Sequence, residues 1–464
     1  MELVYKVNDK PSFGKVIVFA LQQLLAILAA TIAVPAVING GKVLPADFVP
    51  MSQSAALFGA GVGTIVYLLF TKFRSPVFLG SSFAFLGSMA AAFAGAATSS
   101  LGYLGLIIGA AFAGIVYVII ALVVKFAGTG WVDKLMPPVV IGPTVAIIGL
   151  SLAGNAVGDL MKGNVFHVVS GEAVMNCSPY VALVCGLVTL AVTIICSVYG
   201  KKMTKMIPFI LGIVAGYVVA TIFTLIGNAA DLPALQIIDF SKFANMEWIP
   251  NFSFLQAFKG DFGGANIGSY VITIAAAYVP VAFVVFAEHI ADHKNLSSII
   301  GTDLTKDPGL CRTLLGDGVG SIVGAVFGGC PNTTYGESVG CVAISGNASV
   351  VTILATAVLA ILASFVGPFV TFLATIPSCV MGGVCMALYG FIAVSGLKML
   401  QPVDLNDNRN LFVASVILIT GIGGMKLVFG SVTITSVACA LILGILTNLL
   451  VSCKKKEKKE SEQA

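Results

Sequence analysis

The sequence predicts an all-α polytopic membrane protein with fourteen transmembrane segments, arranged as two inverted repeats of seven. The chain has 464 residues, of which 58% are hydrophobic and only 10% are charged, whereas soluble domains average about a quarter charged residues. Apolar stretches of about 20 residues, which can cross the hydrocarbon as helices, recur along the whole chain. Seven lie before residue 228 and seven after residue 268, and an odd number of spans gives duplicated halves opposite topology.

The predicted spans follow one another with short polar connections. The first seven are 16–38, 54–71, 77–97, 101–124, 137–156, 179–199 and 206–227. The second seven are 270–288, 314–328, 333–347, 349–373, 376–394, 411–428 and 432–452. The segments 314–328 and 333–347 are shorter than a full membrane-crossing helix, so we expect partial helices there.

The Lys and Arg residues gather in alternate connections, and cytoplasmic loops carry the excess of these residues. With the N-terminus in the cytoplasm, all but five of the 25 Lys and Arg residues fall on the inner side. The five outer ones are Lys42, Lys162, Lys242, Lys259 and Lys426. We therefore expect a multi-pass protein of the cell (inner or plasma) membrane with both termini cytoplasmic. The net charge of +4 reflects this topology and does not indicate a nucleic acid partner.

Neither the cysteines nor the histidines indicate a metal centre or another cofactor. The ten cysteines form no Cys-x-x-Cys pair, and most lie in or beside apolar spans, where cysteine behaves as a small hydrophobe. His167, His289 and His293 are the three histidines, which makes a structural zinc site improbable. The sequence shows no set of nucleophile, base and orienting residue that a hydrolase needs. A membrane-embedded enzyme and an ion channel are accordingly weaker alternatives to a transporter.

Two pairs of matching segments support the duplication. Residues 136–150 and 376–390 align at three positions, although a chance match is the alternative: Pro137 with Pro377, Val140 with Val380, and Gly142 with Gly382. The third and tenth spans each begin with proline, polar residues and glycine before an apolar run. Since proline removes a backbone donor and glycine tolerates extended backbone, we expect both helices to begin unwound. Paired broken helices in matching positions indicate a central binding site.

Two glutamates, Glu288 and Glu337, lie within or beside these apolar segments. Carboxylates in the membrane are costly and usually functional; a buried structural hydrogen-bonding role is the alternative. All Lys and Arg residues lie in loops or near span ends, so none is expected to neutralise the pair. Burial disfavours the charged form of a carboxyl, which can then bind a proton. A carboxyl that both binds a proton and contacts a solute couples the entry of the two.

The pair also indicates the chemistry of the solute. A neutral carboxylic acid presents a donor beside an acceptor, which matches the adjacent N–H and C=O of a cyclic amide or imide. Two ionised glutamates repel an inorganic anion. The predicted substrate is therefore a planar neutral heterocycle. Phe83 and Tyr335 can provide apolar faces for its ring, with ordinary packing as the alternative for Phe83.

Three segments closely resemble the uracil permeases of the nucleobase-ascorbate (uracil/xanthine) transporter family. They are LGSSFAF at 79–85, FAEHIADHKNLSSIIG at 286–301 and GDGVGSIVGAVFGGCPNTTYGESVG at 316–340. The resemblance extends over essentially the whole chain. It implies uracil uptake with protons by alternating access, with xanthine or another purine as the alternative substrate. A homodimer in the lipid bilayer is also implied.

The resemblance further implies a core domain (spans 1–4 and 8–11), a gate domain (spans 5–7 and 12–14), and short antiparallel strands in the broken spans 3 and 10. The divisions are 1–126 (core), 127–228 (gate), 229–269 (extracellular linker), 270–374 (core), 375–452 (gate) and 453–464 (cytoplasmic tail). Glu288 and Glu337 are implied to hydrogen-bond the uracil ring, and the backbone at Phe83 and Gly336 to meet its polar edges. Ala30, Tyr335 and Tyr389 are implied to line the pocket.

The chain departs from the family pattern at two positions. Gln23 stands where the family carries histidine after glutamine, and Asp292 stands where related uracil permeases often carry histidine. The spacing of four residues places Asp292 on the same face as Glu288 if the helix continues that far. We therefore expect Glu288 and Asp292 to take part in proton coupling, with a solvated acid at the cytoplasmic mouth as the alternative for Asp292.

Overall fold

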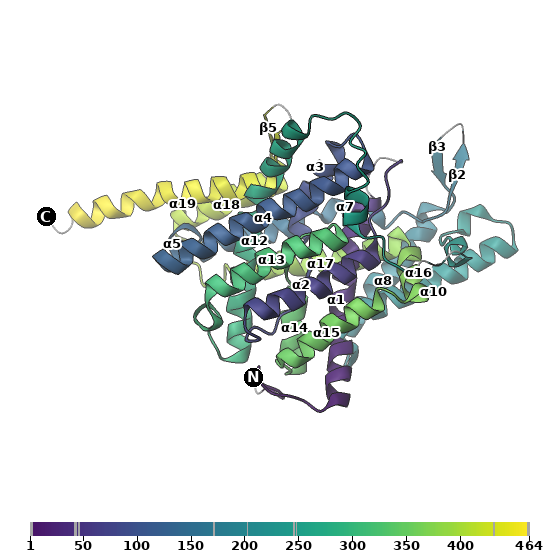
Figure 1. The fold of residues 1–464 in the computed structure, drawn as a ribbon, viewed down its shortest axis with the longest axis horizontal. Helices are drawn as coiled ribbons and strands as arrows, with labels where there is room; N and C mark the ends of the chain where they lie inside the picture. Colours follow the sequence, from purple (N-terminus) through teal and green to yellow (C-terminus); the bar gives the residue numbers. More distant parts are fainter. Residues whose placement is uncertain are drawn as a thin grey trace.

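The protein is a bundle of apolar helices with three small pairs of strands (Figure 1). The computed structural model describes residues 3–40, 44, 47–169, 172–201, 203–244, 246, 248–429 and 432–461. In this part of the chain, nine helices are long and apolar enough to cross a membrane, or ten if one sharply bent pair counts as a span. Lys42, residues 245 and 247 of the expected linker, and the last tail residues, 462–464, lie outside the described residues.

The long helices alternate with shorter helices and strands. The long ones are α1 (Phe13–Gly40), α2 (Gln53–Phe70), α4 (Ser99–Ala127), α6 (Pro138–Ser151) continuing into α7 (Ala153–Asp159), α8 (Pro179–Tyr199), α10 (Pro208–Ala229), α12 (Ile267–Ile300), α13 (Leu310–Gly328) and α17 (Ser378–Lys398). The shorter α-helices are α3 (Leu86–Ala94), α5 (Gly130–Leu135), α9 (Met203–Met206), α11 (Ser253–Ala257), α14 (Gly336–Ser345), α15 (Val350–Ala363), α16 (Gly367–Thr375) and α18 (Asn408–Ile422). The last helix, α19 (Ser436–Ser461), is long, but its apolar part ends at Ser452. Further short turns are η1 (Phe83–Phe85), η2 (Pro233–Leu235), η3 (Phe240–Ala244) and η4 (Thr305–Gly309). The strands are β1 (Leu79–Ser81), β2 (Phe166–Val169), β3 (Glu172–Met175), β4 (Asn332–Thr334), β5 (Leu427–Phe429) and β6 (Val432–Ile434).

Several helix starts follow directly from local sequence. The Ser52 side chain accepts a hydrogen bond from the Ala55 N–H at the start of α2, and Thr98 does the same for Leu101 at the start of α4. These side chains satisfy backbone donors that the first turn leaves unpaired. The helices α6, α8 and α10 begin at proline, which lacks the N–H that would otherwise be unpaired there.

The helices pack in two sets, each drawn from both halves of the chain. In the first set, α13 lies between α2 and α4, α12 packs on α4, and α15 packs on α1 and α2. In the second set, α17 contacts α6 and α8, α8 contacts α10, and α18 contacts α6 and α19. The sets meet where α1 and α12 contact α6, α10, α17 and α19. A cavity lined by Glu288 and Glu337 lies along this boundary.

The predicted strands in the third and tenth spans are confirmed. Strand β1 pairs with β4 in antiparallel register, with Gly80 opposite Thr333. Each strand leads into a short helix, β1 through η1 into α3 and β4 into α14. The sequence did not predict the antiparallel pairs β2–β3 and β5–β6. The pair β2–β3 lies in the connection between the fifth and sixth predicted spans. The pair β5–β6 lies where the thirteenth predicted span ends and the fourteenth begins.

The structure corrects several predicted spans. Residues 314–328 are part of a full-length helix, because α13 begins at Leu310 and the apolar stretch extends from Thr305 to Gly328. The helix predicted to end near residue 288 continues to Ile300. The predicted span 349–373 is a pair of helices, α15 and α16, bent by 84°. The predicted segments 77–97, 333–347 and 411–428 correspond to short helices joined to strands, and 432–452 corresponds to a strand followed by the apolar part of α19.

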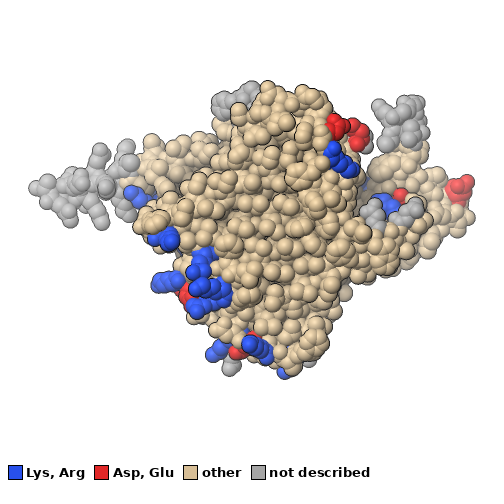
Figure 2. All heavy atoms as spheres, in the orientation of Figure 1, with Lys and Arg blue, Asp and Glu red and all other residues tan. Residues whose placement is uncertain are grey.

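The surface has the character expected of a multi-pass membrane protein. Figure 2 shows a broad uncharged area across the middle of one face, with Lys and Arg gathered along its lower left edge. The outer helices expose large apolar side chains at helical spacing, for example Val214, Val218 and Ile222 on α10. Contiguous apolar surface of this kind indicates contact with lipid or protein.

Candidate functional site

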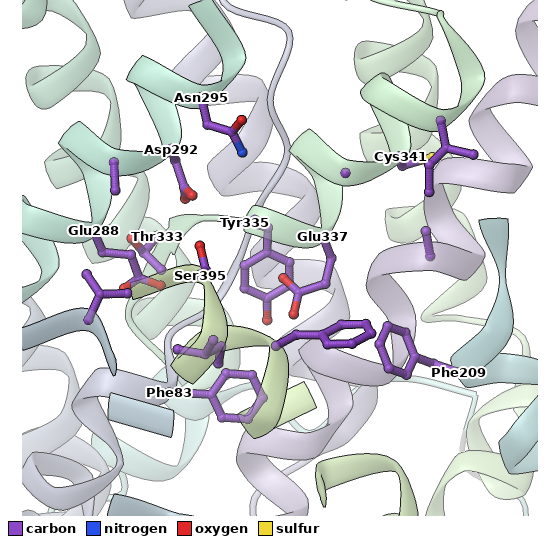
Figure 3. A pocket seen from close by; sticks show the side chains of 18 of the residues that line it. Phe83, Phe209, Glu288, Asp292, Asn295, Thr333, Tyr335, Glu337, Cys341 and Ser395 are labelled. Carbon is purple, nitrogen blue, oxygen red and sulfur yellow. The ribbon is translucent and has the colours of Figure 1, made fainter. Parts of the chain in front are cut away.

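A cavity of about 240 Å³ lies between the two sets of helices, and we call it the acidic cavity (Figure 3). Its polar lining comes mainly from α12, β4 and α14, and its apolar lining from α1, α6, α10 and α17. The lining residues are Ala26, Phe83, Val145, Ser197, Lys205, Pro208, Phe209, Glu288, Ala291, Asp292, Asn295, Thr333, Tyr335, Gly336, Glu337, Gly340, Cys341, Ile344, Phe391, Ile392 and Ser395.

Three carboxylates share this cavity. Glu288 and Asp292 lie on one face of α12, since residues four apart on a helix are neighbours, and Glu337 lies in the first turn of α14. All three side chains are partly buried. The cavity therefore concentrates acidic groups in an apolar surrounding. Such a site favours a neutral ligand or a cation over an anion, because like charges repel.

The paired strands fix one wall of the cavity. The Tyr335 N–H donates to the Phe78 carbonyl at 3.2 Å, and the Tyr335 hydroxyl donates to the Ser81 carbonyl at 2.8 Å. Tyr335 therefore bridges β1 and the start of α14. Gly80 allows this arrangement, because a Cβ atom there would lie 2.3 Å from the Tyr335 ring. The backbone between β4 and Glu337 is consequently held in place from both strands.

Asp292 is tied to the same wall. The Thr334 hydroxyl donates to the Asp292 carboxylate at 2.9 Å, which links α12 to β4. Helix α12 continues to Ile300, so Asp292 lies on the same helix face as Glu288, as the spacing predicted. Asp292 is partly buried and lines the cavity. The part of Asp292 in proton coupling stays a prediction.

Gln23, the residue that replaces an expected histidine, joins α1 to α14. Its side-chain amide donates to the Ser338 hydroxyl at 2.5 Å, and the Phe78 N–H donates to the same hydroxyl at 2.9 Å. Ser338 is fully buried and immediately follows Glu337. The turn that carries Glu337 is thus anchored to both α1 and the segment before β1.

The structure brings five of the seven expected substrate-binding residues to the cavity: Phe83, Glu288, Tyr335, Gly336 and Glu337. Ala30 and Tyr389 are not among its lining residues. Ala30 is completely buried in α1. Tyr389, on α17, is also buried and contacts the Phe83 ring edge-to-face, with ring centroids 5.4 Å apart. These two residues lie behind the lining instead of on it.

Sequence reasoning missed Asn295, Thr333 and Ser395, which add neutral polar groups to the cavity. The sequence did contain a signal for Asn295, because the spacing of Glu288, Asp292 and Asn295 is that of one helix face. It contained no signal for Ser395, because Ser395 reaches the cavity only through the way α17 packs against the other helices. Lys205 also lines the cavity. It is exposed and belongs to the short helix α9, which places it at the opening.

A second polar group lies on the other side of α12. His289 contacts the Asp317 carboxylate at 2.7 Å through Nδ1 and the Thr313 hydroxyl at 3.0 Å through Nε2. His293 Nδ1 donates to the His289 carbonyl at 2.8 Å, and its Nε2 lies 2.7 Å from the Tyr67 hydroxyl, which itself donates to the Ser75 hydroxyl at 2.7 Å. All of these side chains are buried. These contacts fix α12 against α2 and α13, while the second carboxylate oxygen of Asp317, Oδ1, is buried without a hydrogen-bond partner among the described residues.

Comparison with known proteins agrees with this architecture. The sequence model described as "Permease family" matches residues 14–429. The chain is 40% identical over 452 residues to the uracil permease of Bacillus caldolyticus, covering 97% of this chain and 94% of that protein. It is 37% identical over 461 residues to the uracil permease of Bacillus subtilis (strain 168), and this match covers 98% of this chain and 97% of that protein.

Among solved structures, the transmembrane domain of the cyanobacterial bicarbonate transporter BicA has the same fold. The TM-score is 0.60 and the match covers 96% of this chain and 100% of that domain, at 15% sequence identity. Identity this low shows a shared fold and no more. The family match and the full-length relatives show that this chain is a permease, and that it belongs to the nucleobase-ascorbate transporter family, which contains the bacterial uracil permeases.

Proposed function

We propose that this protein is a secondary active transporter that imports uracil together with protons. The observation that carries the proposal is the meeting of Glu288, Asp292 and Glu337 in one small cavity, in a chain whose full-length relatives are named uracil permeases. Carboxylates accept hydrogen bonds from ring N–H groups when ionised and donate one when protonated. A uracil ring, which alternates N–H and C=O along its edge, suits such a site.

The cavity provides complementary groups for the rest of the ring. Phe83 and Tyr335 supply aromatic surface, and Thr333 and Gly336 are part of the extended wall that leads into α14. Gly336 is exposed to the cavity side without a side chain of its own. The proposed contacts are therefore Glu337 and the Gly336 backbone on one side and Glu288 on the other. Ala30 and Tyr389 support this lining from behind.

Proton coupling is proposed to use Glu288 and Asp292. The two groups share a face of α12, and the cavity that contains Glu288 also contains Asp292. Placing several carboxylates together disfavours ionisation of all of them at once, so at least one proton is held at the site. Substrate and proton then share a single set of ligands, which is the requirement for coupled entry.

Transport is proposed to proceed by alternating access, with the first helix set as the core domain and the second as the gate domain. The packing of α12, α13 and α15 with α1–α4, and of α17–α19 with α6, α8 and α10, supports this division. The short helices α3, α14 and α18 and the apolar part of α19 are proposed to complete fourteen spans in two inverted repeats. Both termini are proposed to be cytoplasmic, in accordance with the distribution of Lys and Arg.

The test of substrate is uptake of radiolabelled uracil into proteoliposomes that contain the purified chain, with an acidic outer buffer and with xanthine, adenine and thymine as competitors. The proposal expects accumulation of uracil that unlabelled uracil suppresses most strongly. Preferential suppression by xanthine would instead assign a purine carrier of the same fold. No uptake of any nucleobase by correctly folded protein would refute the proposed function.

A further inference from the structure

A second, larger cavity lies on the opposite side of the acidic site, between the same two sets of helices. Its volume is about 870 Å³, and we call it the distal cavity. It is lined by polar residues that include Asn155, Asp159 and Lys162. Lys162 and Lys426, which also lines it, are two of the five cations that the charge pattern places outside. Lys205, at the mouth of the acidic cavity, falls on the inner side.

Phe83 lines both cavities, and among the described residues it is the one that their linings have in common. Its side chain is only 7% exposed. Figure 3 shows its ring at the end of the acidic cavity opposite Asn295. The ring therefore forms the floor of one cavity and the end wall of the other.

Two helices beside Phe83, α6 and α1, also line both cavities at different points along their length. On α6, Val145 lines the acidic cavity and Ile148, one turn later, lines the distal cavity. On α1, Ala26 lines the acidic cavity and Val37 lines the distal cavity, while Ala30 between them is completely buried. The closed layer between the cavities is therefore one turn deep on α6, whereas eleven residues separate Ala26 from Val37 on α1.

Tyr389 completes that layer from the other helix set. Its ring meets the Phe83 ring edge-to-face at 5.4 Å with an interplanar angle of 81°, a favourable geometry for an aromatic pair. Its backbone is fixed, because a Cβ atom on Gly149 of α6 would lie 2.2 Å from the Tyr389 carbonyl oxygen. One ring of the pair comes from the first helix set and the other from the second.

We propose that the Phe83–Tyr389 ring pair is the barrier that separates the acidic site from the distal cavity, so that access from the distal side requires the two rings to part. This inference rests on the proposed function, because it assigns how the transported solute is kept from crossing directly. It gives Phe83 a role beyond contact with the substrate. It also explains why Tyr389 and Ala30 lie at the site without lining the acidic cavity.

Cys341 provides a probe that does not depend on transport. It lines the acidic cavity, and no cysteine is among the lining residues of the distal cavity in the described part of the chain. Right-side-out and inverted membrane vesicles containing the full chain are treated on ice with a membrane-impermeant methanethiosulfonate. The labelling rate of Cys341 is measured by mass spectrometry of its peptide.

In the unmodified protein, Cys341 is expected to react much faster from the face to which the acidic cavity opens. In Phe83→Ala, the rate from the other face should rise until the two rates are similar. Tyr389→Ala removes the partner ring and should act in the same way, which keeps the test decisive if one variant does not fold. Phe83→Leu, which keeps apolar bulk, should give an intermediate rate.

Phe85→Ala is the matched control. Phe85 belongs to the same short turn and is also buried, but it stacks on Tyr278 and lines neither cavity. It should leave the labelling one-sided. One-sided labelling in folded Phe83→Ala and Tyr389→Ala, or equal labelling from both faces in the unmodified protein, would overturn the barrier. Failure of uracil uptake in the unmodified protein would refute the proposed function and leave the labelling result intact.

Discussion

Thr334 donates a 2.9 Å hydrogen bond to the carboxylate of Asp292. This contact joins the strand that precedes Glu337 to the helix that carries Glu288. A change in the protonation of Asp292 therefore acts directly on the extended segment that forms one wall of the proposed uracil site. The proposed proton and substrate functions are linked through one hydrogen bond between β4 and α12.

We predict that Asp292→Asn preserves the exchange of uracil across the membrane but abolishes its accumulation against a concentration gradient. The amide still accepts from Thr334 through its oxygen, so the wall is preserved, but it no longer binds and releases a proton. Exchange of labelled for unlabelled uracil across the membrane should persist, while accumulation driven by a pH gradient should be lost. Asp303→Asn, in an exposed loop, is the control. Full gradient-driven accumulation in Asp292→Asn would remove Asp292 from proton coupling.

Thr334→Val tests the hydrogen bond from its other end. The substitution keeps the shape of the side chain and removes the hydroxyl, leaving the carboxylate without this donor. A hydrogen bond to a charged group contributes about 1.5–3 kcal/mol, so we expect weaker uracil binding and a changed pH dependence of uptake. The measurement is uracil affinity as a function of pH. An unchanged pH profile would show that Thr334 does not influence the protonation of Asp292.

Glu337→Gln is predicted to weaken uracil binding strongly and to abolish uptake. The charged acceptor is replaced by a neutral amide, and loss of about 1.5–3 kcal/mol corresponds to roughly a ten- to hundredfold lower affinity. Equilibrium binding of labelled uracil to the purified variant measures this directly. Near-normal binding would make Glu337 a structural residue that caps α14.

Ser338→Ala is predicted to reduce stability and uptake together. The Ser338 hydroxyl accepts hydrogen bonds from Gln23 and from the Phe78 N–H. Its removal leaves the buried Phe78 N–H unpaired and leaves the Gln23 amide with only its longer bond, 3.4 Å, to the Ser338 carbonyl. An unsatisfied buried polar group costs about 1–3 kcal/mol, so the apparent unfolding temperature in detergent should fall. Ser298→Ala, on the exposed face of α12, should leave it unchanged. Equal stability of the two variants would contradict this account of the anchor.

Gly80→Ala is predicted to damage transport by displacing Tyr335. A Cβ atom at position 80 would lie 2.3 Å from the Tyr335 ring, so either the ring or β1 must move. Overpacking of this kind costs typically about 1–3 kcal/mol, and the β4 segment before Glu337 shifts with it. Gly390→Ala is the control, since nothing lies within 4 Å of its added Cβ atom. Normal uracil affinity in Gly80→Ala would show that the site tolerates a displaced Tyr335.

Local chemistry explains which parts of the site could be predicted from sequence. Proline, glycine and polar residues before an apolar run predicted that the helices of the third and tenth spans begin unwound, and the strands β1 and β4 lie at these positions. The spacing of Glu288 and Asp292 predicted a shared face, because helical periodicity is a property of adjacent residues. The carboxylates were recognisable because they stand out in an apolar sequence.

Contacts between distant segments were not predictable in the same way. The bond from Gln23 to Ser338 and the pair His289–Asp317 depend on how helices pack, and nothing in the local sequence specifies them. The continuation of α12 to Ile300 was missed because its last turns are polar, although His293 and Leu296 there are buried against neighbouring helices. The positions of Ala30 and Tyr389 behind the lining likewise follow from packing.

Uracil-driven proton entry tests the central claim most directly. Proteoliposomes containing the purified chain, with a pH-sensitive dye inside and no initial pH gradient, receive uracil in the outer buffer. We predict acidification of the interior that depends on uracil and is absent in Glu337→Gln. Entry of labelled uracil into the same vesicles without any acidification would contradict proton symport.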